Sequence, residues 1–370
     1  MKIGIITHYY NSENYGGNLQ AYALCRVLNK MGHNAEQISL DRTIDKGIWN
    51  EIKKPLRKVK HFRGITAERN FKVRKKSILG FNKSIAHSPV YSEKNICSAG
   101  DKYDAYITGS DQVWHPHACC DAYLLKFVPS HKLKLSYAAS IAHNEIPEKF
   151  IAWYKEGLKD FRGISVREYE AIGLLKDIAP IDVEQCLDPT LLLLKEEWEE
   201  IASPSDINEP YLFCYYLGES KRDRTLAKEY ATKKGLKIVT LPNLQGVVRS
   251  CDENFGDYML YDVSPQKLIS LISEASCVFT DSFHACVFSI IFKKDFFVFH
   301  RSEYRNMNSR IVNLLDMFNL NENFCDTDGK ANLDYIERIS SVNSRIKQEK
   351  YLAAREASFE YLEKNLVDEN

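Results

Sequence analysis

A short segment in the second half of the chain, Thr280-Asp281-Ser282-Phe283-His284, has the residue types of an anion-binding catalytic site. It follows the apolar run Cys277–Phe279, which is typical of a buried strand, and Asp281 or Ser282 can cap the apolar helix expected over 283–292. His284 then lies in the first helical turn, where unpaired N–H groups and the helix dipole favour a phosphate. This placement predicts that His284 is a general acid beside a bound anion. A buried histidine bonded to a neighbouring carbonyl is the alternative.

Two other expected strands end in charged side chains. Arg167 follows the short apolar strand that ends at Val166, and arginine suits bidentate binding of a carboxylate or phosphate. An ion pair with Glu168 or Glu170 is the structural alternative. In Gly109-Ser110-Asp111 the glycine allows close approach of a ligand, so that Asp111 could act as a general base or bind a hydroxyl group. An Asx turn or a helix cap would explain Asp111 equally well.

Two further segments could bind an anion or a sugar. Asn14-Tyr15-Gly16-Gly17-Asn18 is rich in glycine, but it has neither the GxGxxG spacing nor a P-loop lysine, so it predicts either backbone donors or a simple turn. Asn308-Ser309-Arg310 begins a helix after a stretch that contains His300, Arg301 and Arg305. Such a cluster can close on an anionic ligand, or it can lie on a solvated surface.

The elements that must position these segments alternate between strands and helices. Hydrophobic periodicity and helix caps predict strands over 3–7, 35–40, 104–108, 132–138, 163–166, 211–217, 236–241, 277–280 and 296–299. They predict helices over 18–31, 49–60, 66–80, 147–160, 220–234, 264–273, 283–292, 305–318 and 343–366. Two successive βαβ series predict an α/β protein with two Rossmann-like domains facing across a cleft. In such sheets ligands bind beyond the carboxyl ends of the strands.

The length of the chain supports this division, because 370 residues exceed what one hydrophobic core usually holds. We expect an N-terminal Rossmann-like domain over 1–172 that includes a basic helical segment, 46–83. A C-terminal Rossmann-like domain is expected over 173–342, followed by a C-terminal helix over 343–370.

Composition and charge limit the classes of function that the chain can have. The formal net charge is +0, so no global field attracts nucleic acid. Segment 46–83 carries 13 Lys and Arg against only Glu51 and Glu68; it predicts either two solvated helices or a surface for an anionic ligand or lipid. No signal sequence and no run of about 18–20 apolar residues is found, so we expect a cytoplasmic protein.

The ten cysteines predict neither disulfides nor a metal site. Several lie within apolar strand or helix patterns, where a thiol behaves as a small hydrophobic group. There is no CxxC pair, and nothing near His115, His117 and Cys119-Cys120 completes a ligand set. We therefore expect no metal.

Six segments together resemble the polysaccharide pyruvyl transferase family. They occur in the order found in that family and span residues 1 to about 318. The segments are Asn14 to Leu24, Gly109-Ser110-Asp111-Gln112-Val113-Trp114, Ile164-Ser165-Val166-Arg167-Glu168, Asp188-Pro189-Thr190, Thr280-Asp281-Ser282-Phe283-His284 and Asn308-Ser309-Arg310-Ile311. The chain departs from the family at Ala285, where a glycine is often found, and at Gly17-Asn18, where an Ala-Val pair is common.

The resemblance implies a GT-B-like fold and transfer of pyruvate from phosphoenolpyruvate, as a ketal, onto two hydroxyl groups of one sugar. It links His284 and Arg167 to the donor, on the C-terminal side. With the motifs above, the expected catalytic residues are His284 and Asp111. The expected donor-binding residues are Arg167, Ser282, Phe283, His284 and Arg310. The expected acceptor-binding residues, on the N-terminal side, are Asn14, Tyr15, Gly16, Asn18 and Trp114. No cofactor is expected, because phosphoenolpyruvate is itself the donor substrate.

The expected partners are phosphoenolpyruvate and an oligosaccharide or lipid-linked sugar acceptor, with peripheral contact at the inner membrane face through the basic segment and no nucleic acid. Two other functions stay open. One is a GT-B glycosyltransferase with a nucleotide-sugar donor, for which Glu253 or Asp257 could bind the ribose. The other is a non-catalytic partner in polysaccharide assembly.

Overall fold

The computed structural model describes residues 1–44, 65–116, 120–243, 249–301, 309–325, 332–339 and 341–367. The predicted helix over 49–60 lies outside these residues, as do His117, Cys119, Arg305 and Asn308. The chain divides into two compact units. The first unit comprises Met1–Lys60, Asn82–Leu193 and Leu352–Asn370, and the second comprises His61–Phe81 and Leu194–Tyr351.

The first unit is built on a parallel sheet with the order β3-β2-β1-β4-β5. Its strands are β1 (Lys2–Ile6), β2 (Asn34–Leu40), β3 (His87–Tyr91), β4 (Ala105–Thr108) and β5 (Leu133–Ser136). Strands β6 (Ile164–Val166) and β7 (Val183–Gln185) pair in parallel beside it. Backbone bonds from Ser136 N to Gly163 O and from Ala139 N to Ser165 O join β5 to β6. The sheet therefore continues in the order 3-2-1-4-5-6-7.

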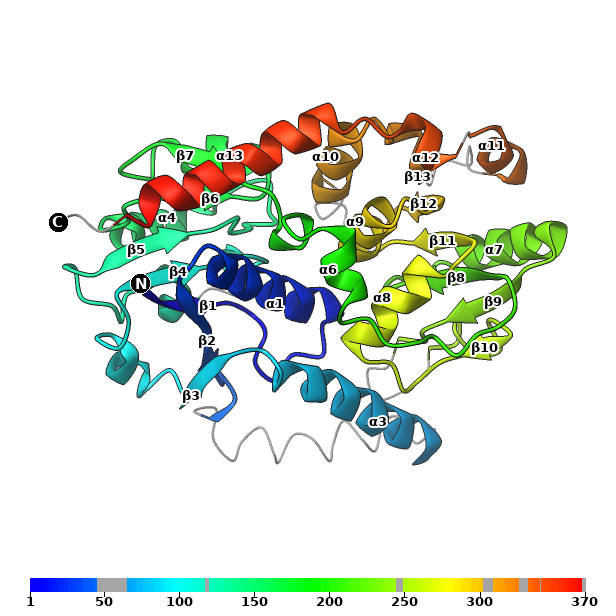
Figure 1. Cartoon of the computed structure of the whole chain (residues 1–370), viewed down its shortest axis with the longest axis horizontal. Helices are drawn as coiled ribbons and strands as arrows, with labels where there is room; N and C mark the ends of the chain where they lie inside the picture. The colour runs from blue at the N-terminus through cyan, green and yellow to red at the C-terminus, as the bar shows by residue number, and fades with distance from the viewer. Residues whose placement is uncertain are drawn as a thin grey trace. The chain divides into compact units, whose positions relative to one another are not determined.

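Helix α13 (Glu349–Asn365) returns to this unit and packs along β6 and β7 (Figure 1). The hydroxyl of Tyr361 donates to Ser136 O at 2.7 Å, and Ser358 Oγ accepts from Leu187 N at 3.0 Å. A Cβ atom at Gly163 would lie 2.7 Å from Oδ1 of Asn365, so only glycine permits this approach. The other α-helices that the structure describes in this unit are α1 (Tyr15–Lys30), α4 (Glu148–Leu158) and α5 (Tyr169–Leu175).

The second unit holds a six-stranded parallel sheet with the order β10-β9-β8-β11-β12-β13. Its strands are β8 (Tyr211–Tyr215), β9 (Lys237–Thr240), β10 (Tyr258–Met259), β11 (Cys277–Thr280), β12 (Phe296–Phe299) and β13 (Phe324–Cys325). Counted along the chain, this is the order 3-2-1-4-5-6 of a Rossmann fold. Both sheets thus have the same strand order over their first five strands.

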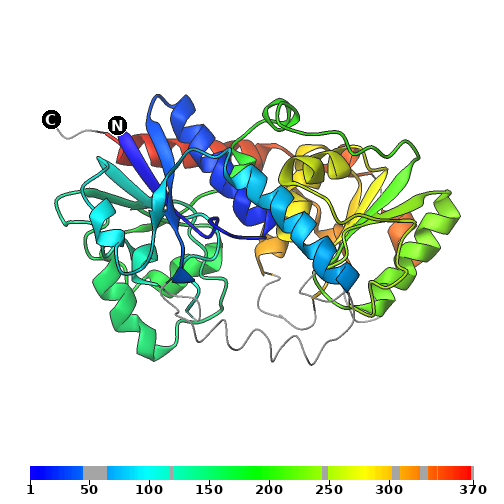
Figure 2. The same ribbon diagram turned by 90° about the horizontal axis from the view of Figure 1, so that it is seen from below.

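Helices cover both faces of the second sheet (Figure 2). Side chains alternate along a strand, so Leu212 and Cys214 of β8 point to the face that α7 (Lys221–Lys234) and α11 (Leu333–Arg338) cover. Helices α8 (Pro265–Ser273) and α9 (Phe283–Ile291) pack on the other face. The remaining helices that the structure describes around this unit are α3 (Ile65–Asn82), α6 (Lys195–Glu199), α10 (Ser309–Met317) and α12 (Val342–Arg345).

The observed elements confirm the predicted strands and most predicted helices to within a few residues. Helix α1 begins at Tyr15 and not at 18, because the side chain of Asn14 accepts a hydrogen bond from Gly17 N and caps the helix there. The predicted tail helix begins at Glu349 and not at 343, and α10 is described from Ser309. None of the helices in the described ranges is both long and apolar enough to cross a membrane.

The units divide at other points than the predicted domains. The predicted boundary after 172 would separate β6 from β7, which pair with each other, and the observed division falls after Leu193. The segment from Leu352 onward, predicted as a separate C-terminal helix, is part of the first unit. In addition, α3 up to Phe81 belongs to the second unit, whereas the basic segment was assigned to the N-terminal domain.

Candidate active site

The strand order locates one candidate site in each unit. It reverses between β1 and β4 in the first sheet and between β8 and β11 in the second, and ligands bind beyond the carboxyl ends of strands at such reversals. The first sheet presents His8 after β1 and Asp111 after β4. The second presents Leu217–Gly218 after β8 and Asp281–His284 after β11. The reversal points therefore contain two of the predicted segments, Gly109-Ser110-Asp111 and Thr280–His284.

In the second unit, Asp281 connects the two strand ends. Its Oδ1 accepts from Leu217 N at 2.7 Å and its Oδ2 accepts from Gly218 N at 2.6 Å. A Cβ atom at position 218 would lie 2.9 Å from Asp281 Oδ2, so the glycine allows this approach. Ser282 occupies the N-cap position of α9 without a capping bond from its side chain. Asp281 thus holds the β8–α7 loop and does not cap the helix.

His284 lies half-buried in the first turn of α9, as predicted. Its ring packs edge-on against Phe283, with ring centroids 5.2 Å apart. Two arginines lie beside this segment: Nη2 of Arg301 donates to Asp281 O at 2.9 Å, and the guanidinium of Arg310 lies 5.9 Å from the centre of the Phe283 ring. Because Nη2 of Arg301 also lies 3.5 Å from Asp281 Oδ1, its charge is partly offset, and the start of α9 offers backbone N–H donors together with the guanidinium of Arg310.

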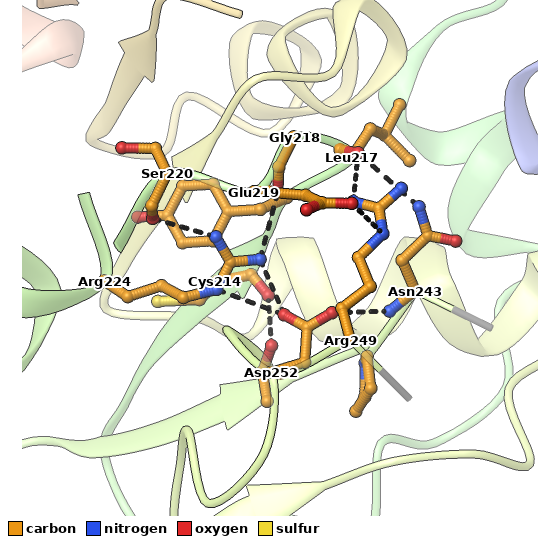
Figure 3. Close-up of polar contacts among 12 residues, drawn as sticks. Cys214, Leu217, Gly218, Glu219, Ser220, Arg224, Asn243, Arg249 and Asp252 are labelled. Carbon is orange, nitrogen blue, oxygen red and sulfur yellow. Dashed lines mark hydrogen bonds and ion pairs between the residues drawn. The ribbon is translucent and has the colours of Figure 1, made fainter. Parts of the chain in front are cut away.

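A second network fixes the opposite side of the β8–α7 loop (Figure 3). Nη1 of Arg249 donates to Leu217 O at 2.6 Å, and Nη2 of Arg224 donates to Gly218 O at 3.1 Å. Arg224 is buried and bonds Asp252 Oδ1 through Nε at 3.1 Å and Nη2 at 2.6 Å. The loop is thus held through its N–H groups by a carboxylate and through its carbonyls by two guanidinium groups, which keeps it rigid at the site.

Asp223, in the first turn of α7, is the carboxyl group of this unit that titrates nearest to neutrality among those with a resolved shift. Burial, and then the negative charge of Asp281, raise its pKa to about 6, and a hydrogen bond with Ser220 opposes the shift. Asp223 is not part of any of the predicted segments. Only its position just after the β8 loop could have indicated it.

In the first unit, Arg167 is surrounded by carboxylates. Its Nη1 lies 2.6 Å from Asp188 Oδ2, its Nη2 lies 3.6 Å from Asp111 Oδ1, and its Nε lies 3.8 Å from Glu168 Oε1. The Arg167 side chain is 4% exposed. Strands β4, β6 and β7 run parallel in one extended sheet, with β5 between β4 and β6, so the residues that follow them lie along one edge. Three carboxylates around one guanidinium leave this edge with negative charge.

Asp111 also approaches His8 and the start of α1. A Cβ atom at Gly17 would lie 3.0 Å from His8 O and 3.5 Å from Asp111 Oδ2, so residue 17 must be small. Asp111 itself has φ of 70°, a left-handed conformation that is unusual for a residue with a side chain. Burial lowers the pKa of His8, and the charge of Asp111 opposes that shift. His8 was missed in the sequence, although it directly follows β1 and Thr7.

The predicted acceptor-binding residues are mostly buried. Asn14 caps α1, and Tyr15 and Gly16 form its buried first turn. Asn18 is 0% exposed, and its Nδ2 donates to the carbonyls of Ser12 and Asn14. Trp114 is also 0% exposed, and its indole donates to Tyr123 O at 3.0 Å. Direct contact of Asn18 or Trp114 with an acceptor does not fit this burial; both residues stabilise the loops around the site.

Within the described part of the chain, no three His, Cys, Asp or Glu side chains are grouped so that they could hold a metal ion. The nine cysteines of that part are free thiols, and all except Cys97 are buried.

Two solved structures show the class of fold. The UDP-GlcNAc 2-epimerase from Neisseria meningitidis is 12% identical, with a TM-score of 0.51, and the match covers 98% of this chain and 100% of that chain. The UDP-N-acetylglucosamine 2-epimerase from Rickettsia bellii is 10% identical, with a TM-score of 0.54, and the match covers 98% and 95% of the two chains. At these identities the likeness concerns the fold alone, which is GT-B-like with two Rossmann-like domains.

Sequence then assigns the family. The family model for polysaccharide pyruvyl transferase matches residues 14–303, and the chain belongs to that family. No curated protein matches the sequence. The predicted family and fold class are thereby confirmed, and the family implies a transferase that acts on a polysaccharide.

Proposed function

We propose that this protein transfers pyruvate from phosphoenolpyruvate onto two hydroxyl groups of one sugar, in a polysaccharide or its lipid-linked precursor, and forms a pyruvate ketal. The observation that carries this proposal is the position of His284 at the start of α9, a segment that Arg301 contacts at Asp281 O and Arg310 approaches at the Phe283 ring. A donor that bears both a phosphate and a carboxylate needs N–H donors and cations, and this end of the second sheet supplies them.

In this proposal the donor binds to the second unit. Ser282, Phe283 and His284 form the start of the helix, where backbone N–H groups point toward an anion. Arg310 adds a guanidinium group above Phe283. Asp281, Arg224 and Arg249 do not contact the donor; they hold the β8–α7 loop and so position the site.

The reaction needs one proton on carbon and the loss of phosphate. His284 delivers a proton to the methylene carbon, and C2 becomes an oxocarbenium-like centre. The first sugar hydroxyl attacks C2 while its proton passes to a base. The C2–O bond to phosphate then breaks, and the second hydroxyl closes the ring and gives its proton to the departing phosphate. The products are one ketal and one inorganic phosphate for each phosphoenolpyruvate.

The first unit supplies the carboxylates for this chemistry. Asp111 is the base that takes the hydroxyl proton, and Glu168 and Asp188 complete the acidic edge. Because Arg167 already pairs with these three groups, we propose that it positions Asp111 and does not bind the donor, contrary to the expectation from the family resemblance. An acidic edge favours neutral hydroxyl groups over a phosphate.

The test is an assay of the full chain with phosphoenolpyruvate and a panel of oligosaccharides, with inorganic phosphate measured and the products analysed by mass spectrometry. We expect stoichiometric phosphate release and a ketal-bearing sugar, and neither with His284→Gln. Tight binding of UDP-GlcNAc in calorimetry, without binding of phosphoenolpyruvate, would instead support a nucleotide-sugar enzyme, as the two structurally similar epimerases are. A chain that binds neither would support a non-catalytic role.

The nucleotide-sugar alternative has less support from the residues. Asp257 was a candidate for ribose binding, but its Oδ2 accepts from Ile238 N at 2.8 Å and its Oδ1 lies 3.8 Å from Lys237 Nζ. Glu253, the other candidate for ribose binding, is exposed and directly follows Asp252 in the chain.

A further inference from the structure

One face of α3 is fixed to the second unit through a buried arginine. Arg74 donates to three backbone carbonyls: Pro242 O at 2.6 Å, Leu260 O at 2.7 Å and Tyr261 O at 3.2 Å. Ile78, one turn further along, is also buried. This anchoring sets the rotation of the helix about its own axis, and so determines which residues face solvent.

The opposite face carries a row of cations. Arg69, Lys72 and Lys76 are all exposed, and their spacing of three and four residues places them on one line along the helix. At 1.5 Å per residue the row is about 10 Å long. Lys72 pairs with Glu68 at 3.1 Å, an exposed contact that stabilises little, whereas Arg69 and Lys76 make no ion pair with the described residues.

We propose that this row, Arg69-Lys72-Lys76, docks the protein on the surface of a membrane that contains anionic lipids. Long, flexible cations on a rigidly held helix are complementary to a plane of lipid phosphates. Each Lys or Arg side chain near such a surface contributes about 1 kcal/mol to the free energy of binding. The formal net charge of +0 means that this attraction is local to the helix and does not come from the whole molecule. A nucleic acid is less favoured, because the row contains no aromatic side chain on which bases could stack.

Membrane docking is separate from the proposed transfer reaction and can be measured without it. The full chain is sedimented with vesicles of phosphatidylglycerol in phosphatidylcholine and with vesicles of phosphatidylcholine alone. We expect binding only to the anionic vesicles, weakened by added salt. Together, Arg69→Gln, Lys72→Gln and Lys76→Gln should weaken this binding about 100-fold.

A matched control changes the same number of charges on another helix. Lys149→Gln, Lys155→Gln and Lys159→Gln alter exposed lysines on or just after α4, where acidic residues such as Glu148 and Glu156 alternate with them. This variant should bind vesicles like the unchanged protein, and thermal melts should show that both variants are folded. Equal binding to both kinds of vesicle, or no loss in the α3 variant, would overturn the proposal. So would binding to duplex DNA without binding to vesicles. Phosphate release with a soluble acceptor should persist in the α3 variant, which separates this proposal from the proposed function.

Discussion

Arg167 and Asp188 form a buried ion pair in which Nη1 and Oδ2 lie 2.6 Å apart. Asp188 Oδ1 also accepts from Thr190 N at 3.0 Å and from its hydroxyl at 2.7 Å, so both carboxylate oxygens are bonded. This fixes Asp188, and through it the guanidinium that lies next to Asp111. The position of the proposed base therefore depends on a residue 21 positions further along the chain from Arg167.

Asp188→Asn should destabilise the first unit, because it removes the carboxylate charge that is hydrogen-bonded to the buried Arg167 and leaves only the more distant Asp111 and Glu168, at 3.6 and 3.8 Å. We expect a loss of about 1.5–3 kcal/mol in the free energy of unfolding, the usual contribution of a hydrogen bond to a charged group, measured by urea denaturation. Glu156→Gln removes the partner of the exposed Lys159, 2.6 Å away, and should cause no measurable loss. Equal stability of Asp188→Asn and the unchanged protein would show that the buried pair does not hold the site.

His284→Gln should abolish most pyruvyl transfer without unfolding the protein. Loss of a positioned general acid lowers the reaction rate about 10²–10⁴-fold. The protein should stay folded, because the half-buried His284 side chain contributes little to the core. The control is His87→Gln, which alters an exposed histidine on β3. Turnover is measured by phosphate release and folding by thermal melting. Full activity of the His284 variant would remove this residue from the mechanism.

Gly218→Ala should displace Asp281 from the β8–α7 loop, since the new methyl group would lie 2.9 Å from Oδ2. Hydrogen bonds to a charged group contribute about 1.5–3 kcal/mol each, so we expect lower stability and a higher KM for phosphoenolpyruvate. Gly173→Ala is the matched control: this helical glycine in α5 has nothing within 4 Å of a Cβ atom. If both alanine variants behave alike in steady-state kinetics, the contact between Asp281 and the loop is not needed.

Asp223 should make stability depend on pH. Its pKa is raised from 3.8 to about 6 in the folded protein, so the folded state binds the proton more tightly than the unfolded state. The resulting contribution of Asp223 to the free energy of unfolding is fully present below about pH 3.8 and is lost as the pH rises through about 6. Asp223→Asn should therefore be more stable than the unchanged protein near pH 8, by no more than about 3 kcal/mol, and this gain should vanish near pH 4. Urea denaturation at both pH values measures it, and a gain independent of pH would contradict the assignment.

Local patterns explain what could be predicted from sequence. The apolar run of β11, followed by a polar cap and an apolar helix, predicted the position of His284 correctly because all of these signals lie within a few residues. Strand β3 was missed because Pro89 and exposed side chains give its five residues the appearance of a loop, as is common for an edge strand.

Contacts between distant residues could not be predicted. Asp281 looked like a helix cap, but its partners Leu217 and Gly218 lie 64 and 63 residues earlier in the chain. Trp114 follows a glycine-containing strand end, as a sugar-stacking residue could, and only the packing around β4 shows that it is in the core. The sequence predicted which side chains follow the strands. It could not predict the direction in which each side chain points, because that depends on how the strands assemble into the sheet.

The return of α13 to the first unit has a consequence for synthesis. The hydroxyl of Tyr361 and the side chain of Ser358 complete hydrogen bonds beside β5 and β7, while the residues between Leu194 and Tyr351 build the second unit. On the ribosome, α13 can cover the sheet of the first unit only after the second unit has been translated. Until then the surface that Tyr361 and Leu362 of α13 bury stays open, and a chaperone can bind there.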